Sequence, residues 1–520
     1  MAPFIFWNLA FYTIIRTQLH VLFLPFLYYN KSKLKRGKGE TPALLWLVIV
    51  LLLFIFQIIT ILVSEFRHPS KAMAWLMILF VFPLIGFIMY YFLAKEYTQR
   101  KIVQRKKGYK MLDELKRELV RQSRSIKIEK DKYSGTILEE PRLFALLYSI
   151  PGSPITQHNE VTVLKNAAST YTSMMEEIEK AEDHIHFEFY TIRHDEIGKQ
   201  FQRLLIRKAL QGVKVRVIFD GIGSYKLSGF YVNELKKAGV EVYCFLPVLF
   251  AFFDKRMNYR NHRKILIVDG KIGFLGGMNI GDEYLGGNPK LGFWRDTHLK
   301  LEGDSVYYLQ QTFLTDWSFV SNQKLSDSKY FPEHQCPGTK AVQVIPSGPD
   351  GEWDSILESI FGGITTAKKR IYITSPYFIP NEAILMGLKT AAMSGVDVKI
   401  IIPGVNDSRI VQYANLSYVQ ELLDSGVEMY QYQRGFIHAK IIIVDTLFAS
   451  VGSANMDVRS FYNNFEINAL LFDKVTIERL HKDFINDLKD SIQIIPSQFE
   501  KRPRFQKVKE AMAHMIDPLF

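Results

Sequence analysis

Short apolar runs alternate with amphipathic stretches from about residue 140 to the end of the chain, a pattern that predicts an α/β fold. The run Ile265 to Val268 has four consecutive aliphatic residues, as expected of a strand buried on both faces. The run at 441–444 repeats this pattern. Each run follows a histidine and a lysine, residue types that rarely begin a buried strand.

The alternating pattern is itself repeated along the chain. The matching pairs of segments are 181–192 with 367–379, 211–221 with 394–404, 238–245 with 425–432, and 273–279 with 449–455. A repeat of this kind predicts two like-folded halves, which we expect to be related by a pseudo-twofold axis. The expected fold class is therefore α/β, with two tandem α/β/α domains.

The N-terminal region has a different pattern. Residues 43–64 and 72–94 contain no charged side chain, and each is long enough to cross about 30 Å of hydrocarbon as a helix. Basic residues flank the pair on both outer sides, at 31–38 and 95–110. We therefore predict an N-terminal transmembrane helical hairpin over 43–94, with both flanks and the domains that follow on the cytoplasmic face of the cell membrane.

Two segments border this hairpin. Residues 4–29 are apolar, but Arg16 and His20 would lie near the middle of a bilayer, so an interfacial or re-entrant helix is favoured over a third span. With the basic linker that follows, this segment makes up region 1–42. Residues 95–135 are strongly charged and predict a helical linker.

Composition narrows the class of partner. The 520-residue chain has a net charge of +12, which favours an anionic membrane surface, a phosphate-bearing substrate or nucleic acid. Its two cysteines, Cys244 and Cys336, cannot form a disulfide framework or a zinc site alone, and we expect them to be reduced.

A histidine motif occurs once in each half. The pattern His-x-Lys-x-x-x-x-Asp is followed by Gly-x-x-Asn, and its residues are His262, Lys264, Asp269, Gly276 and Asn279, then His438, Lys440, Asp445, Gly452 and Asn455. One such match arises easily by chance, whereas two matches with the same extension rarely do. The pair therefore indicates a functional site.

The chemistry follows from strand geometry. Residues two apart on a strand face the same way, so each histidine has a lysine beside it. A histidine is a nucleophile and a proton carrier near neutral pH, and a lysine supplies positive charge for a phosphate oxygen. If the halves meet at the axis, the site is a symmetric cradle for one phosphodiester. No metal-ligand cluster or nucleotide-binding loop is visible, so we expect no cofactor.

With these paired motifs, the sequence resembles the phospholipase D superfamily over roughly residues 136–515. The stretches "NYRNHRKILIVDG", "GGMNIGDEY", "WRDTHLKLEG", "FIHAKIIIVD" and "GSANMDVRSFYNNFEIN" resemble bacterial cardiolipin synthases more narrowly. The resemblance implies two phospholipase D-like domains, which we place at 136–335 and 336–520. It also implies a phosphatidyltransferase that acts on phosphatidylglycerol in anionic membrane lipid, without nucleic acid.

The resemblance assigns roles by position. His262 is expected to attack the phosphorus and His438 to act as acid and then base, although the near-symmetry leaves the reverse assignment open. The phosphate would be held by Lys264, Lys440, Asn279 and Asn455. A downstream carboxylate orients each histidine in this family: we expect Glu466 to serve His438, and Asp296 to serve His262.

Two features of the motifs have separate explanations. Asp269 and Asp445 complete the motif and count as catalytic candidates on that ground, but we expect them to stabilise the local fold rather than to react. The motif's glycine-serine pair is Gly452-Ser453 in the second half and Gly276-Gly277 in the first. We therefore expect Ser453 to contact the phosphate region, with one fewer hydroxyl in the first half.

Two further segments have alternative interpretations. The apolar loop at 245–253 either dips into the bilayer or is buried in the protein. The C-terminal stretch 502–520 predicts an amphipathic helix, which either lies on anionic lipid or packs against the second domain.

The sequence leaves several competing functions open. They are a hydrolase of the phospholipase D type, a nuclease, a transferase with another headgroup acceptor, and a membrane-anchored lipid-binding scaffold without activity. The sequence leaves acceptor preference and oligomeric state open.

Overall fold

The computed structural model describes residues 41–64, 69–83, 86–87, 89–90, 139–247, 259–351 and 353–517. The chain divides into two compact units, Met1–Lys95 and Glu96–Phe520. The predicted segment 4–29, the linker 95–135 and most of the loop at 245–253 lie outside the described residues.

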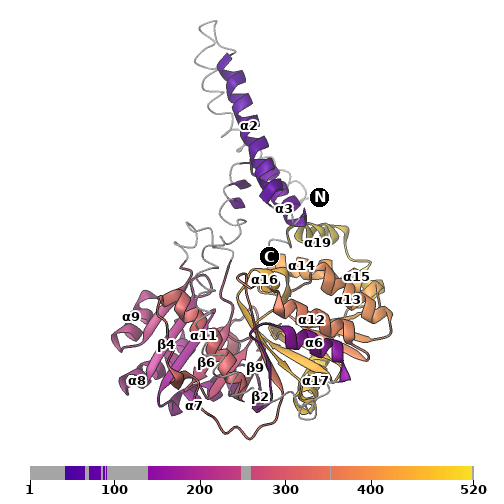
Figure 1. The fold of residues 1–520 in the computed structure, drawn as a ribbon. Coiled ribbons are helices and arrows are strands. Elements are labelled where there is room, and N and C mark those ends of the chain that lie inside the picture. The colour runs from indigo at the N-terminus through magenta and orange to yellow at the C-terminus, as the bar shows by residue number, and fades with distance from the viewer. Residues whose placement is uncertain are drawn as a thin grey trace. The chain divides into compact units, whose positions relative to one another are not determined.

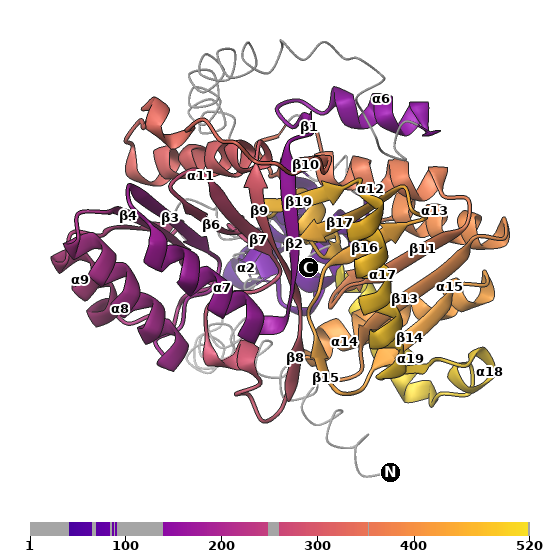
Figure 2. The same ribbon diagram turned by 90° about the horizontal axis from the view of Figure 1, so that it is seen from below.

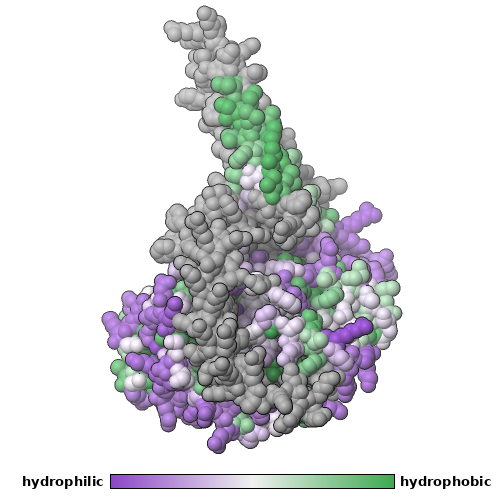
Figure 3. Space-filling view, in the orientation of Figure 1, coloured by the Kyte–Doolittle hydropathy of each residue, from purple (hydrophilic) through white to green (hydrophobic). Residues whose placement is uncertain are grey.

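The first unit contains helices α2 (Thr41–Ser64) and α3 (Pro69–Val81). Helix α2 presents exposed apolar side chains, among them Leu45, Leu52 and Phe56. The described part of this unit has a largely green, hydrophobic surface in Figure 3. Within the described residues, no helix combines the length and apolar character needed to cross a membrane. The hairpin over 43–94 therefore stays a prediction.

The second unit is built around two β-sheets (Figure 2). The first sheet has seven strands in the order β2-β9-β7-β6-β3-β4-β5. These strands are β2 (Asn159–Lys165), β3 (His184–Phe189), β4 (Lys214–Asp220), β5 (Glu241–Phe245), β6 (Lys264–Val268), β7 (Ile272–Gly276) and β9 (Thr297–Gly303). Only the β3–β4 and β4–β5 pairs are parallel.

The second sheet has nine strands in the order β1-β10-β19-β17-β16-β11-β13-β14-β20. These strands are β1 (Ile155–Thr156), β10 (Val342–Ser347), β11 (Arg370–Thr374), β13 (Asp397–Pro403), β14 (Glu428–Tyr432), β16 (Ile441–Val444), β17 (Phe448–Gly452), β19 (Glu466–Leu471) and β20 (Ser491–Gln493). From β10 to β14 the order and directions reproduce those of the first sheet. The predicted duplication is confirmed.

Helices cover the sheets (Figure 1). Those nearest the first sheet in sequence are α7 (Asn166–Lys180), α8 (Glu196–Leu210), α9 (Gly229–Lys237) and α11 (Ser305–Ser321). The others are α6 (Pro141–Ser149), α12 (Ser355–Thr366), α13 (Glu382–Met393), α14 (Arg409–Ser417), α15 (Val419–Asp424), α16 (Val458–Tyr462), α17 (Lys474–Lys489), α18 (Pro496–Phe499) and α19 (Arg504–Ile516). Two 3-10 turns, Asp282–Leu285 and Ser328–Tyr330, lie in connecting segments.

One apolar core belongs to both halves. It contains Leu275 and Leu299 from the first sheet together with Val451 and Ala469 from the second. Each half has a second core of its own under its outer helices. Because burial of apolar surface is the main stabilising term in folding, the shared core fixes the two sheets against each other.

The predicted boundary at residue 136 is wrong for the segment 141–156, which joins the second half. Leu143 and Leu147 of α6 lie in the core of that half, and β1 pairs with β10. The close fit of α6 is visible at Gly362, where an added Cβ would lie 2.5 Å from a Leu146 methyl carbon. The segment precedes the first repeat, so the sequence carries no mark of the half that it joins.

The aspartate that ends each motif lies at the far end of its strand from the histidine. Asp269 and Asp445 both have φ of 52°, in the left-handed region that aspartate tolerates. The Asp269 carboxylate accepts the backbone N–H groups of residues 182–184, and Asp445 those of 368–370, at 2.8–2.9 Å. Each aspartate thus holds the turn that enters the central strand. They are not in the catalytic centre, and the expected structural role fits these contacts.

Replacing Asp445 with alanine should destabilise the fold while leaving the reacting groups in place. Loss of three hydrogen bonds to a charged, partly exposed acceptor should cost about 2–4 kcal/mol. Urea unfolding would measure this cost, with the exposed Asp424→Ala as the matched control. A loss of activity per folded molecule without a loss of stability would contradict the structural role.

Candidate active site

Both histidine-lysine pairs stand where a central strand begins. Lys264 starts β6 opposite Phe189 at the end of β3, and Ile441 starts β16 opposite Thr374 at the end of β11. We call this side of the two sheets the catalytic edge. It is also where the parallel strands β4 and β13 end.

Each motif is preceded by a short arm that pairs with the other half. Strand β15 (Gly435–Ile437) runs parallel to β8 (Phe293–Arg295), and Asn261 forms a bridge with Phe465. The His262 amide donates to the Phe465 carbonyl at 2.9 Å, and the His438 amide donates to the Arg295 carbonyl at 2.7 Å. Both histidines are therefore held by backbone from the opposite half.

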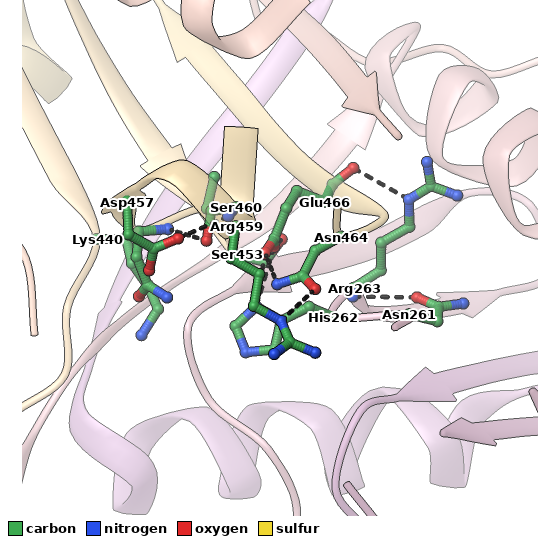
Figure 4. A network of polar contacts seen from close by, with 12 residues as sticks. Asn261, His262, Arg263, Lys440, Ser453, Asp457, Arg459, Ser460, Asn464 and Glu466 are labelled. Carbon is green, nitrogen blue, oxygen red and sulfur yellow. Dashed lines mark hydrogen bonds and ion pairs between the residues drawn. The ribbon is translucent and has the colours of Figure 1, made fainter. Parts of the chain in front are cut away.

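The crossing arms decide which carboxylate each histidine meets. His262 Nδ1 lies 2.9 and 3.0 Å from the two carboxylate oxygens of Glu466 (Figure 4). His438 Nδ1 lies 2.7 Å from Asp296 Oδ2. Both predicted carboxylates contact a histidine, but the predicted pairing is wrong: each carboxylate contacts the histidine of the other half.

The wrong pairing has a physical reason. The sequence repeat shows which segments correspond between halves, and we assumed that a histidine and its carboxylate come from one half. Asp296 and Glu466 each follow the residue whose carbonyl accepts the opposite histidine amide. A periodic pattern carries no information on such contacts between halves.

The paired carboxylates fix the histidine tautomers. Burial alone would raise the pKa of Glu466, but the adjacent His262 and Lys264 outweigh it and lower that pKa. His438 and Lys440 likewise outweigh burial and lower the pKa of Asp296. An ionised carboxylate only accepts hydrogen bonds, so each Nδ1 carries the proton and each Nε2 has a free lone pair.

Both imidazoles are neutral at neutral pH. Burial, assisted by Lys264 and Lys440, lowers the pKa of His262 to about 4 against the opposing effect of Glu466. Burial and Lys440 lower the pKa of His438 to about 3 against the opposing effect of Asp296. A neutral imidazole with a free Nε2 is the nucleophilic form of histidine.

The two lysines are buried beside their histidines. Lys264 Nζ donates to the His262 carbonyl at 2.5 Å, and Lys440 Nζ donates to the His438 carbonyl at 2.6 Å. Burial lowers the pKa of Lys440 to about 8, and burial together with Lys440 lowers the pKa of Lys264 well below its usual value. Two closely placed lysines in a buried site favour an anion between them, because the anion offsets the cost of burying their charge.

The two asparagines are not equivalent. The Asn279 side chain accepts from the Thr191 amide at 3.1 Å and donates to the Tyr284 hydroxyl at 3.0 Å, so both ends of its amide are engaged. Asn455 is also buried, but among the described residues its Oδ1 has no hydrogen-bond partner. The Asn455 side chain is thus the less engaged of the two, and its Nδ2 is the end that could donate to a phosphate oxygen.

Ser453 supports a carboxylate in the structure. Its hydroxyl donates to Glu466 at 2.5 Å and accepts the Ile467 amide at 2.9 Å, so the expected contact with phosphate is replaced by these bonds. At Gly277, the matching position, an added Cβ would lie 2.3 Å from an oxygen of Asp296. The halves thus use two matched sets: serine with glutamate, and glycine with the shorter aspartate.

Sequence reasoning missed several residues around the histidines. The Tyr190 ring lies 4.9 Å from the His262 ring, with Lys264 Nζ 5.4 Å from the Tyr190 ring centre. The Trp294 ring lies 5.1 Å from the His438 ring. Tyr190 lies near the end of the segment 181–192 and has no matching tyrosine in register, and Trp294 is part of "WRDTHL", where only the aspartate drew attention. Across the described residues, no group of three or more histidine, cysteine or acidic side chains is arranged to hold a metal ion.

A duplicated sheet with one His-x-Lys pair per half defines a phospholipase D-like protein, and comparison with known proteins agrees. The family described as "Cardiolipin synthase, PLD-like domain" matches residues 174–317 and 360–488. The family described as "Phospholipase_D-nuclease N-terminal" matches residues 52–95.

Similar proteins place the chain more narrowly. A cardiolipin synthase of Geobacillus kaustophilus is 43% identical over 88% of this chain and 90% of its own length. A cardiolipin synthase of Alkalihalophilus pseudofirmus is 41% identical over 97% of this chain and 100% of its own length. The chain belongs to the cardiolipin synthase family of phospholipase D-like enzymes, which are phosphatidyltransferases.

A solved structure has the same fold. The crystal structure of phosphatidylserine synthase from Haemophilus influenzae superposes with a TM-score of 0.56, at 14% sequence identity, over 74% of this chain and 100% of its own. At this level of identity, the likeness concerns the fold alone.

Removing the charge of one carboxylate should change the pKa of only one histidine, that of the opposite half. Glu466→Gln should lower the pKa of His262 further and leave that of His438 nearly unchanged, because Glu466 raises the pKa of the histidine that it contacts. Asp296→Asn should do the converse. Nitrogen-15 NMR titration of the two imidazoles would measure both shifts. A shift confined to the histidine of the same half would contradict the crossed pairing.

Proposed function

We propose that this protein makes cardiolipin from two molecules of phosphatidylglycerol and releases glycerol. The carrying observation is the pair of neutral histidines, each oriented by an ionised carboxylate and each with a buried lysine, at one catalytic edge. Membership in the cardiolipin synthase family supports this choice of reaction over other phosphodiester chemistry.

In the first step, His262 Nε2 attacks the phosphorus of one phosphatidylglycerol. The bond from phosphorus to the glycerol headgroup breaks, and a phosphohistidine forms. His438, which takes up a proton on Nε2 once the substrate is bound, gives that proton to the leaving oxygen. Its pKa of about 3 applies without substrate. An anionic phosphodiester would raise that pKa, since it offsets the lysine charges that lower it.

In the second step, the neutral His438 takes the proton from a headgroup hydroxyl of a second phosphatidylglycerol. That oxygen attacks the phosphohistidine, the phosphorus–nitrogen bond breaks, and cardiolipin leaves. Glu466 stabilises His262 while its ring carries positive charge, because the carboxylate accepts the Nδ1 proton. Lys264, Lys440 and Asn455 are the proposed phosphate contacts.

We also propose that the chain is held at the membrane by a hairpin over 43–94, with the catalytic unit on the cytoplasmic side. The support is the absence of charged residues from 43–64 and 72–94, the basic residues on both flanks, and the match of residues 52–95 to an N-terminal family. The exposed apolar side chains of α2 agree with a lipid environment.

The purified protein should convert phosphatidylglycerol to cardiolipin and glycerol in equal amounts, followed by mass spectrometry. His262→Ala and His438→Ala should each lower turnover by at least about 10³-fold, because each histidine acts in both steps. Phosphatidic acid without cardiolipin would instead identify a hydrolase, and the absence of any turnover would favour a binding scaffold. Reactions with labelled substrate that are quenched in alkaline denaturant should place the phosphorus on His262 rather than His438.

The dependence of kcat/KM on pH should differ from that of an enzyme whose catalytic histidine has its ordinary pKa. His262 must be unprotonated and His438 must take up a proton, so kcat/KM should fall below a limb near pH 4, the pKa of His262, and should also fall as the pH rises above it, because the pKa of His438 in the free enzyme is about 3. Lys440 loses its charge above about pH 8, so the fall should steepen there. A single limb near 6.5 would show that the free enzyme does not hold His262 in this environment.

A further inference from the structure

The C-terminal helix α19 rests on the second half by one face. Its residues Glu510 and Ala513 are buried on that face. Lys509 Nζ lies 3.3 Å from the Tyr413 hydroxyl, and His514 Nδ1 lies 3.4 Å from Ser417 Oγ, so α19 lies along α14 (Figure 1). Because residue numbers rise together along both helices, the two run parallel.

The opposite face of α19 is apolar and exposed. Phe505, Val508, Met512 and Met515 are each more than half exposed, at 55, 53, 53 and 52%. Their spacing of three, four and three residues places them on one side of a helix. We call these four residues the α19 stripe. Packing against the second domain, one of the two predicted alternatives, therefore accounts for only one face.

The charge beside the α19 stripe is all positive. Arg504 and Lys507 are exposed, and Lys509 is partly exposed with its Nζ 4.4 Å from the Phe505 ring centre. The acidic residues of 501–517 are Glu510 and Asp517, and both are buried. Glu510 is bound to Arg502 at 2.8 Å, and Asp517 to His514 at 2.9 Å. The exposed surface of the helix therefore combines apolar and cationic side chains without a carboxylate.

The start of the α19 stripe lies toward the catalytic edge. Helix α14 follows the loop after β13, and in that loop Asp407 accepts a hydrogen bond from Tyr377. The charge of Asp407 acts on Lys440 and raises its pKa against burial. Because α19 runs parallel to α14, Phe505 stands at the end of α19 that is nearer to this loop.

The first half also presents aromatic side chains on this side. The segment after β4 carries Tyr225 and Phe230, which are 67% and 64% exposed. Lys226 lies with its Nζ 5.5 Å from the Tyr225 ring centre. Since β4 ends at the catalytic edge, each half contributes exposed apolar and cationic residues beside the active site.

We propose that the α19 stripe, together with Tyr225 and Phe230, docks the catalytic unit on an anionic phospholipid bilayer. The inference rests on the proposed function, since a lipid phosphodiester must reach the catalytic edge while its acyl chains stay in the membrane. Apolar side chains flanked by cations are the composition that binds such an interface. A second copy of the chain is a poor occupant, because a symmetric contact through α19 would set cations against cations.

The experiment compares two valines that differ in their position on the second half. Val508 lies in the α19 stripe, whereas Val475, which is 74% exposed, starts α17. Strand β19 leaves the catalytic edge at Glu466 and ends before α17, so Val475 lies at the opposite edge. Full-length Val508→Cys and Val475→Cys, each with Cys244→Ala and Cys336→Ala, would be labelled with bimane and reconstituted into phosphatidylglycerol vesicles with brominated acyl chains.

Bimane at position 508 should lose about half of its fluorescence, because an interfacial helix sits about 5–10 Å into the headgroup and acyl boundary. Bimane at position 475 should be unaffected. The proposal is overturned if bimane at position 508 shows no quenching or if both positions are quenched equally. It is also overturned if the unlabelled Val508→Cys variant forms disulfide cross-links between copies while the labelled variant shows no quenching by lipid.

Catalysis supplies an independent readout. Phe505→Gln with Val508→Gln should lower turnover of long-chain phosphatidylglycerol in vesicles about tenfold, since burying even one such side chain is worth more than that factor. Turnover of monomeric short-chain phosphatidylglycerol should be unchanged, as should both activities of Val475→Gln. Equal losses on both substrates would point to a damaged fold and overturn the docking role. If the unmodified protein makes no cardiolipin, the proposed function fails while the quenching comparison keeps its meaning.

Discussion

The crossed contact between each histidine and the carboxylate of the other half is the interaction on which the site depends. It requires the arm before each motif to pair with backbone of the opposite half, and it requires both sheets to be fixed by their shared core. Without Glu466, His262 would have no acceptor for its Nδ1 proton. The reactive nitrogen of each half is thus oriented by the other, and neither half contains a complete catalytic unit.

The same contact sets the electrostatics. Two carboxylates, two lysines and two imidazoles share a buried space, and burial lowers the pKa of each basic group. The carboxylates remain ionised because the neighbouring positive groups outweigh the cost of burial. The buried site therefore holds neutral nucleophiles beside positive charge. In water, the interactions between these groups at the same distances would be much weaker and would not keep them in these states.

The fold and the two histidine-lysine pairs could be read from the sequence because they are periodic. The apolar runs gave the strands, and the repeat gave two sheets with matching order. The contacts between halves could not be read in this way. Asp296 and Glu466 were found by their place in the motifs, but their partners depend on arms such as β15, whose pairing with β8 leaves no periodic trace. Likewise, Gly277 looked like a lost hydroxyl, whereas the structure shows that Asp296 occupies the space of a side chain there.

The attachment of α6 and β1 to the second sheet has a consequence for synthesis. Thr156 donates its hydroxyl hydrogen bond to Val342, 186 residues further along the chain. A ribosome adds about 5–20 residues per second, so α6 and β1 emerge roughly 10–40 s before strand β10, with which β1 pairs. By the end of that interval all strands of the first sheet have been made, while the apolar face of α6 still has no native surface to cover. The segment therefore waits for its native partners until the second half of the chain has been made.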